Sequence, residues 1–273
     1  MRKLLAFIAI VMLVNSAFAQ DKKTKEKKWS VNATADFMSR YVWRGTDFGA
    51  SPSIQPTLSF TNGKFELGAW GAYATFSNYT ETDLYAKYSF KGFTVALTDY
   101  YIPTSAGAFN DSRYLIVNDG TSIDFDTLDG TPKNYFTTHS AELSLQYKGP
   151  EKFPITILAG TFLYGNDKLP VDTTFTPGHQ IQNIGFKNQY STYFEVGYTF
   201  TCKNSTYDVF AGMTTGKSVY STPLYTPGFA VVNLGITGYR KIKMSSDFEL
   251  PVKASLICNP QASSIFFVFG FTL

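Results

Sequence analysis

The sequence has few cysteines and histidines and no apolar run long enough for a membrane helix. It has two cysteines and two histidines among 273 residues. Two histidines do not support a histidine metal cluster. Cys202 and Cys258 fall at opposite ends of the strands expected below, so we expect two free thiols. No run reaches the roughly 20 apolar residues that a membrane helix needs. We therefore expect no cofactor, no metal and no membrane helix.

The one marked apolar run lies at the N-terminus. Arg2 and Lys3 precede apolar residues 4–14, and residues 17–19 read Ala-Phe-Ala. A short basic segment, an apolar stretch and a small-any-small pattern are typical of a secretory signal peptide. We predict a signal peptide over 1–19. Because Gln20, and not a cysteine, follows the expected cut, a lipid anchor is not indicated.

An excess of charge of one sign is also missing. The expected cleavage removes two of the 24 basic residues and none of the 21 acidic ones, which leaves one net positive charge. Only the tail over 20–28, with five lysines, is strongly basic, and such runs are usually solvated. We expect no nucleic-acid partner.

Aromatic residues and period-two alternation are what the sequence has in abundance. It contains 18 Tyr and 25 Phe, far more than an ordinary soluble domain. Apolar and polar residues alternate in a series of segments, as they do in strands with one buried and one polar face. The expected strands are 29–45, 54–60, 65–76, 83–90, 93–102, 140–147, 154–164, 190–200, 206–214, 229–239, 249–259 and 263–273.

The connections between these strands alternate in length. Every second one is short, and the three longest, which include 103–136 and 165–189, fall on the opposite side. Short turns on one rim and long loops on the other are typical of outer-membrane barrels, with the short turns in the periplasm. We therefore predict an all-β fold: a closed antiparallel transmembrane β-barrel of about 12 strands over 29–273, placed in the cell outer membrane. A secreted β-sandwich is the alternative.

Two details qualify the strand assignment. Pro56 and Pro251 fall inside predicted strands, where a missing N–H interrupts the ladder, so those strands carry bulges or begin later. The long segment 103–136 has room for a small hairpin of its own at 114–125. We place interfacial aromatic girdles at both rims, with Tyr41 and Trp43 at the outer one.

Three short motifs resemble those of a known family. Residues 39–45 read SRYVWRG, Asn259 and Pro260 precede the last strand, and residues 267–270 read FVFG. In these motifs the chain resembles the TorF-like family of outer-membrane porins, and the resemblance runs along the whole barrel. It implies a barrel in the outer membrane and pore formation. The closing strand also resembles the signal read by the barrel-assembly machinery, which we expect as a partner during biogenesis.

Inward-facing positions make the candidate site. The expected lumen is polar, mixed in sign and aromatic, and we single out for selectivity Asp36, Arg40, Arg44, Lys87, Glu142, Glu195 and Lys253, with the aromatics Trp70, Tyr85, Tyr100, Phe162 and Tyr193. Arg40 and Arg44 have no carboxylate on the neighbouring strands, so they are expected either to meet anionic or polyhydroxyl solutes at the outer mouth or to pair with loop acids such as Asp47 and Asp111. The other charges can instead neutralise one another.

Catalytic and calcium sites have weaker support. His139 and Ser140 suggest a lipase-like dyad, but neighbours on a strand point to opposite faces. Asp124, Asp126 and Asp129 distantly resemble a calcium loop that lacks its closing glutamate. A barrel of about twelve strands has room for a narrow or nearly plugged pore. We expect a porin-like channel that is embedded in outer-membrane lipids and allows passive diffusion of small polar or ionic solutes. We expect no enzyme. A closed barrel that binds through its loops is the alternative.

Overall fold

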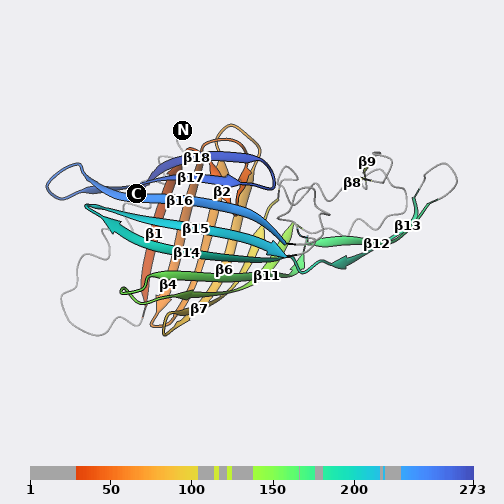
Figure 1. The fold of residues 1–273 in the computed structure, drawn as a ribbon, viewed down its shortest axis with the longest axis horizontal. Coiled ribbons are helices and arrows are strands. Elements are labelled where there is room, and N and C mark those ends of the chain that lie inside the picture. The colour runs from red at the N-terminus through yellow and green to blue at the C-terminus, as the bar shows by residue number, and fades with distance from the viewer. Residues whose placement is uncertain are drawn as a thin grey trace.

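The alternating segments form a closed antiparallel barrel of twelve strands (Figure 1). This computed structural model describes residues 29–103, 114–116, 122–124, 138–165, 167–175, 181–215, 218 and 229–273. In order around the barrel, the strands are β1 (Ser30–Met38), β18 (Ser264–Thr272), β17 (Glu249–Asn259), β16 (Phe229–Lys243), β15 (Ser205–Thr215), β14 (Thr192–Cys202), β11 (Ile155–Gly165), β10 (His139–Lys148), β7 (Phe93–Tyr101), β6 (Thr80–Phe90), β5 (Phe65–Ala74) and β4 (Ser53–Asn62). The predicted barrel is confirmed, and the closed strand order excludes a sandwich.

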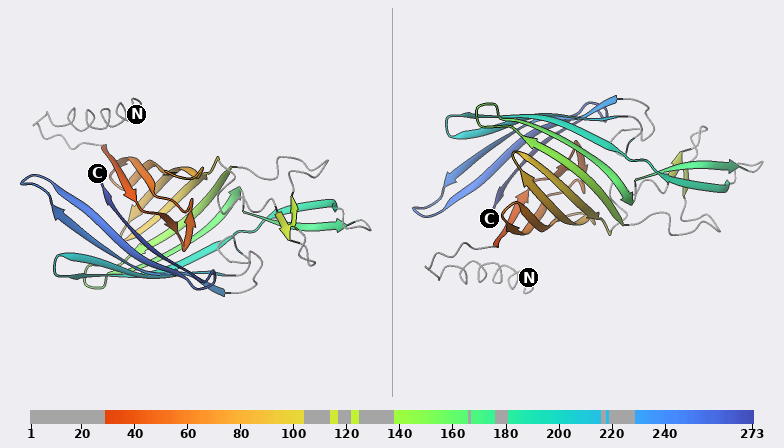
Figure 2. Two further views of the ribbon diagram at one scale, coloured as in Figure 1. Left: turned by 90° about the horizontal axis from the view of Figure 1, so that it is seen from above. Right: turned by 90° about the horizontal axis from the view of Figure 1, so that it is seen from below.

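Three two-stranded ribbons occupy connections between barrel strands. They pair β2 (Tyr41–Trp43) with β3 (Thr46–Phe48), β8 (Tyr114–Ile116) with β9 (Ser122–Asp124), and β12 (Lys168–Phe175) with β13 (Ile181–Asn188). The small hairpin expected within 114–125 is confirmed. The β12–β13 ribbon projects away from the barrel end (Figures 1 and 2). Within the described residues, no helix has the length and hydropathy to cross a membrane. The expected signal peptide and basic tail lie outside them.

The two faces of the barrel wall differ as the alternation predicts. Leu84 on β6 and Phe267 on β18 are 60% and 63% exposed on the outside, and every other barrel strand also presents apolar side chains there. On the inside, Glu142 and Tyr193 are almost fully buried. Apolar side chains cover a wide outer surface that costs free energy in water and none in hydrocarbon. The exterior is therefore suited to a lipid environment.

The two rims of the barrel differ in the length of their connections. At one end, which we call the terminal rim, lie Ser30, Leu273 and the turns at 63–64, 91–92, 149–154, 203–204 and 244–248. At the other end, the loop rim, lie the connections at 39–52, 75–79, 102–138, 166–191, 216–228 and 260–263. The predicted asymmetry is confirmed. Pairs of outward aromatics follow the terminal rim, including Phe93 with Tyr147 and Phe200 with Tyr207.

The first predicted strand is wrong in its second half. It was expected to run from 29 to 45, but β1 ends at Met38 and the chain turns into the lumen as the β2–β3 hairpin. Tyr41 and Trp43, expected in the outer girdle, lie inside. The bulges or later starts expected at Pro56 and Pro251 are wrong, because β4 begins at Ser53, β17 begins at Glu249, and neither ladder shifts register. Pro56 lies opposite Ala35, and the β4–β5 ladder skips it. Pro251 lies just outside the β17–β18 ladder, which begins at Val252.

Because β1 ends early, the seam that closes the barrel is short. β1 and β18 share three residue pairs, from Asp36 opposite Thr272 to Met38 opposite Gly270. The seam is extended by one step at each end. Ala35 and Leu273 exchange two backbone hydrogen bonds, and Ser39 donates its N–H to Phe269 O while its Oγ accepts from Phe269 N. Beyond this point β18 continues to Ser264 with β17 as its only ladder neighbour. The seam is the least paired interface of the barrel.

Candidate functional site

The β2–β3 hairpin fills the lumen near the loop rim. Its two-residue turn is Arg44-Gly45, with φ of 47° and 79°, the left-handed conformation that tight hairpin turns require. A Cβ at Gly45 would overlap the carbonyl oxygen of Val232 on β16. Asn259 on β17 donates its Nδ2 to Gly45 O at 3.2 Å. The tip of the hairpin is therefore pressed against the opposite wall, and only glycine fits there.

Arg44 joins this tip to the wall through a two-pronged ion pair. Its Nη1 and Nη2 donate to the two carboxylate oxygens of Glu142 on β10, the second at 2.9 Å, and both side chains are under a tenth exposed. The guanidinium carbon lies 4.4 Å from the ring centres of Trp43 and Tyr193. Tyr100 also donates to Glu142, at 3.3 Å. Charge pairing and aromatic faces together hold the guanidinium away from water.

The space for this ion pair depends on a missing side chain. Gly160 on β11 lies beside it, and a Cβ there would come within 2.9 Å of Glu142 Oε1 and 3.1 Å of Arg44 Nη2. Such separations are shorter than ordinary carbon contacts, so the pair would have to move. Gly160 is not at a positive φ. It therefore serves close packing and not a turn.

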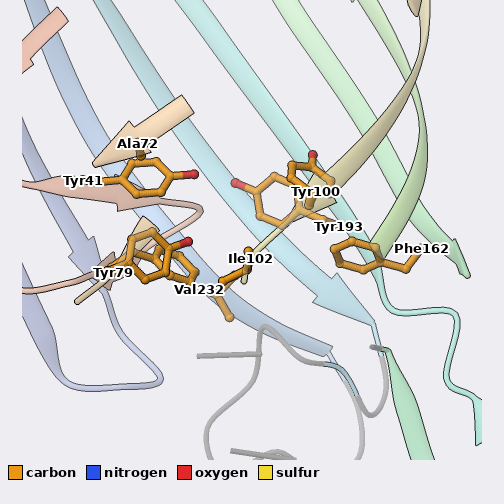
Figure 3. Close-up of a cluster of buried hydrophobic side chains, with 9 residues drawn as sticks. Tyr41, Ala72, Tyr79, Tyr100, Ile102, Phe162, Tyr193 and Val232 are labelled. Carbon is orange, nitrogen blue, oxygen red and sulfur yellow. The ribbon is translucent and has the colours of Figure 1, made fainter. Parts of the chain in front are cut away.

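A cluster of aromatic side chains surrounds the hairpin (Figure 3). Tyr41 on β2 packs against Trp70 at 5.1 Å between ring centres, and Trp43 packs against Tyr100 at 5.5 Å. Its fully or largely buried members are Tyr41, Phe48, Ala72, Tyr79, Tyr100, Ile102, Phe162, Tyr193 and Val232. Four of the predicted lumen aromatics thus pack around the hairpin, namely Trp70, Tyr100, Phe162 and Tyr193.

Arg40 and Arg44 do not project unpaired from a strand, as one hypothesis had it. Arg40 forms an ion pair with Asp47, within the same hairpin segment. The alternative, in which Asp47 folds in to pair with an arginine, is confirmed for Arg40. Arg44 instead pairs with Glu142, 98 residues away. The error follows from the strand boundary, because both arginines leave the β1 face once the chain turns inward. Asp111 lies outside the described residues.

The terminal half of the lumen is wetter and also charge-paired. Lys253 Nζ donates to Asp36 at 2.6 Å, and Thr272 donates to the other oxygen of Asp36. Lys87 Nζ lies 3.3 Å from Glu66 and 3.9 Å from the Tyr85 ring centre. Side-chain exposure in these two ion pairs runs from 25% to 38%, against 8% and 3% for Arg44 and Glu142. These two ion pairs are therefore far more exposed to solvent than the Arg44–Glu142 pair.

Two buried acidic side chains on β6 were not among the candidate residues. Glu81 and Asp83 are buried beside Tyr79, whose hydroxyl donates to Glu81 Oε2 at 2.5 Å. Burial, and then the Glu81 charge, raises the pKa of the Tyr79 phenol far above its ordinary value. Glu81 was overlooked because the predicted strand began at 83. Extending the alternation backward by two residues would have found it.

A cavity of about 280 Å³ lies below the hairpin. Its wall combines charged and polar side chains with apolar ones. Glu195, one of the predicted lumen acids, lines it and accepts hydrogen bonds from Tyr193 Oη and from Asn233 Nδ2 at 3.0 Å. The described lining residues are Met38, Arg40, Tyr41, Val42, Arg44, Gln55, Glu195, Phe210, Asn233, Thr237, Tyr239, Lys253, Ser255, Ile257 and Val268.

The weaker chemical hypotheses can be placed in the same way. His139 points outward, where Nδ1 lies 2.8 Å from Asp99, while Ser140 is buried on the inner face. The expected separation of the two side chains is confirmed.

Cys202 and Cys258 are both free thiols, as predicted. Among the described residues no three metal-ligating side chains gather. Asp126 and Asp129 lie outside that part of the chain, and only the backbone of Asp124 is described.

Comparisons with known proteins give no family and a weak structural similarity. No family model matches the chain, and no curated protein matches it either. Among solved structures, BamA from Haemophilus ducreyi lacking POTRA domains 1-3 is similar, with 12% identity over 86% of this chain and a TM-score of 0.39. The chain spans about two fifths (41%) of that BamA chain. The resemblance to the TorF-like family is not tested by these comparisons and stays a prediction.

Proposed function

We propose that the protein is an outer-membrane barrel that passes small polar or ionic solutes when its internal hairpin moves. The proposal rests on one observation: a polar, charge-paired lumen is interrupted by a folded-in hairpin that is held through the Arg44–Glu142 ion pair. Buried charged pairs add little net stability, because desolvation offsets their attraction, but they suit a two-state latch. Ionisable groups at membrane depth commonly mark solute pathways.

The outer surface supports the location. Apolar side chains cover the outward face of the barrel, aromatic pairs follow the terminal rim, and all connections at that rim are short. Barrels with this combination belong in an outer membrane, with the short turns in the periplasm. Outer-membrane lipids and the assembly machinery remain proposed partners on this reading. The TorF-like resemblance points the same way.

Conductance in planar bilayers tests the channel directly. β1 and β4 are paired as far as Met38 opposite Ser53, so residues 40–51 can be replaced by Asn-Gly, which makes a four-residue connection together with Ser39 and Pro52. Ser39 is kept for the seam. We expect the natural chain to be mostly closed and the shortened chain to conduct steadily. A difference in migration between the unheated and the heated barrel in detergent gels provides the folding control.

The alternative is a closed barrel that binds through its loops. It is favoured by the depth to which the hairpin is buried, with Tyr41 and Phe48 less than a tenth exposed. If the shortened chain folds but carries no current, the channel is refuted and the closed barrel is preferred. An enzyme has less support, because His139 and Ser140 face opposite sides of the wall.

A further inference from the structure

We infer that the cavity below the hairpin is a binding site for a small organic carboxylate with an apolar body. The inference rests on the proposed function, because it names the solute that reaches the hairpin from the terminal rim. It draws on the size of the cavity, the charges in its wall and the position of its apolar side chains.

The size of the cavity sets the size of the ligand. Its volume of about 280 Å³ equals the space of about nine water molecules at roughly 30 Å³ each. A ligand of about ten non-hydrogen atoms fills such a space. The space suits a small acid with a ring or a short alkyl chain better than a disaccharide or a peptide.

The charges in the wall select an anion. Arg40 from the hairpin segment and Lys253 from β17 both line the cavity. Each spends one N–H on its own carboxylate, Asp47 or Asp36, and neither of these acids is among the described lining residues. A guanidinium has five N–H donors and an ammonium three, so both groups keep donors for a ligand. Glu195 is the single acid among the described lining residues, and it already accepts two hydrogen bonds.

An apolar wall completes the site. Met38, Ile257 and Val268 form a small buried cluster, against which Val42 and Phe210 pack, and all five side chains line the cavity. A hydrophilic ion gains nothing from such a surface. A carboxylate that carries a ring or branched chain buries its apolar part against these side chains, while its charged end meets Arg40 and Lys253. The combination favours an amphiphilic anion over an inorganic ion or a sugar.

The experiment compares three probes of nearly equal shape and different charge. Binding of benzoate, benzyl alcohol and benzylamine to the folded barrel in detergent is measured by saturation-transfer NMR, with empty micelles as background. For a ligand of this size we expect a benzoate dissociation constant of about 1 mM or lower. Benzyl alcohol should bind about tenfold more weakly, and benzylamine should not bind. Equal affinity for benzoate and benzyl alcohol would refute the charge selection.

Paired variants locate the binding without leaving a lone buried charge. Lys253→Met with Asp36→Asn removes one cation together with its partner, and benzoate affinity should fall about tenfold. Lys87→Met with Glu66→Gln is the matched control, because it removes an ion pair of the same lumen that does not line the cavity. Affinity should be unchanged in the control. If both double variants behave alike, the site is not this cavity.

Binding and conduction can fail separately. The NMR experiment uses the closed barrel at equilibrium and needs no current. Benzoate binding in a barrel that never conducts would support the site and refute the channel. Conduction without benzoate binding would support the channel and refute the site.

Discussion

Arg44→Ala should open the lumen, and the structure gives the scale of the effect. The substitution leaves Glu142 buried with no cation, and it also removes the contacts of the guanidinium with Trp43 and Tyr193. Breaking one partner of a buried ion pair costs about 3–5 kcal/mol. If this cost falls on the closed state, the ratio of open to closed molecules rises at least about a hundredfold. Single-channel recordings should show openings that are both more frequent and longer.

A double variant tests whether the ion pair itself is responsible. Arg44→Met with Glu142→Leu removes both charges, and apolar pairs in such positions are commonly as stable as the ions they replace. The double variant should therefore stay closed although it lacks Arg44. Calorimetry of the folded barrels provides the stability comparison. If the single and the double variant conduct equally, or if both are silent, the latch is refuted and the ion pair is only part of the packing.

Three further expectations concern packing, topology and the seam. Gly160→Ala should lower the melting temperature of the barrel at a cost of about 1–3 kcal/mol, whereas Gly197→Ala, where a Cβ has 3.4 Å of clearance, should change it little. In intact cells, a maleimide on a polymer too large to cross the outer membrane should label the Asn78→Cys variant at the loop rim and spare the native Cys202. Labelling of Cys202 would show that the terminal rim, and not the loop rim, faces the outside. The amide of Phe267, beyond the last β1 partner, should exchange with deuterium faster than other amides in the middle of barrel strands, and equal protection would contradict the short seam.

The barrel itself was predictable because its information is local. Each strand shows its own alternation, for example Leu84, Ala86 and Tyr88 outward against Asp83 and Lys87 inward. The rim asymmetry follows from connection lengths, which are also read directly along the chain. Neither feature depends on which strands meet across the lumen.

The β2–β3 hairpin inside the lumen was not predictable by the same reasoning. Tyr41 and Trp43 continue the alternation of β1, because a hairpin ribbon inside a barrel has the same period as the wall strand that it leaves. The available signal was Arg44-Gly45, a pair that fits a tight two-residue turn. The partner of Arg44 could not be read at all, since Glu142 reaches it only through closure of the barrel.

The hydrogen bonds between Ser39 and Phe269 link the seam to the internal hairpin. The residue that fastens the side wall to Phe269 immediately precedes Arg40, where the chain enters the plug. Movement of the β2–β3 hairpin therefore acts directly on the seam, which is the least paired interface of the barrel. We therefore expect that movement of the hairpin out of the lumen also loosens the hydrogen bonds between Ser39 and Phe269.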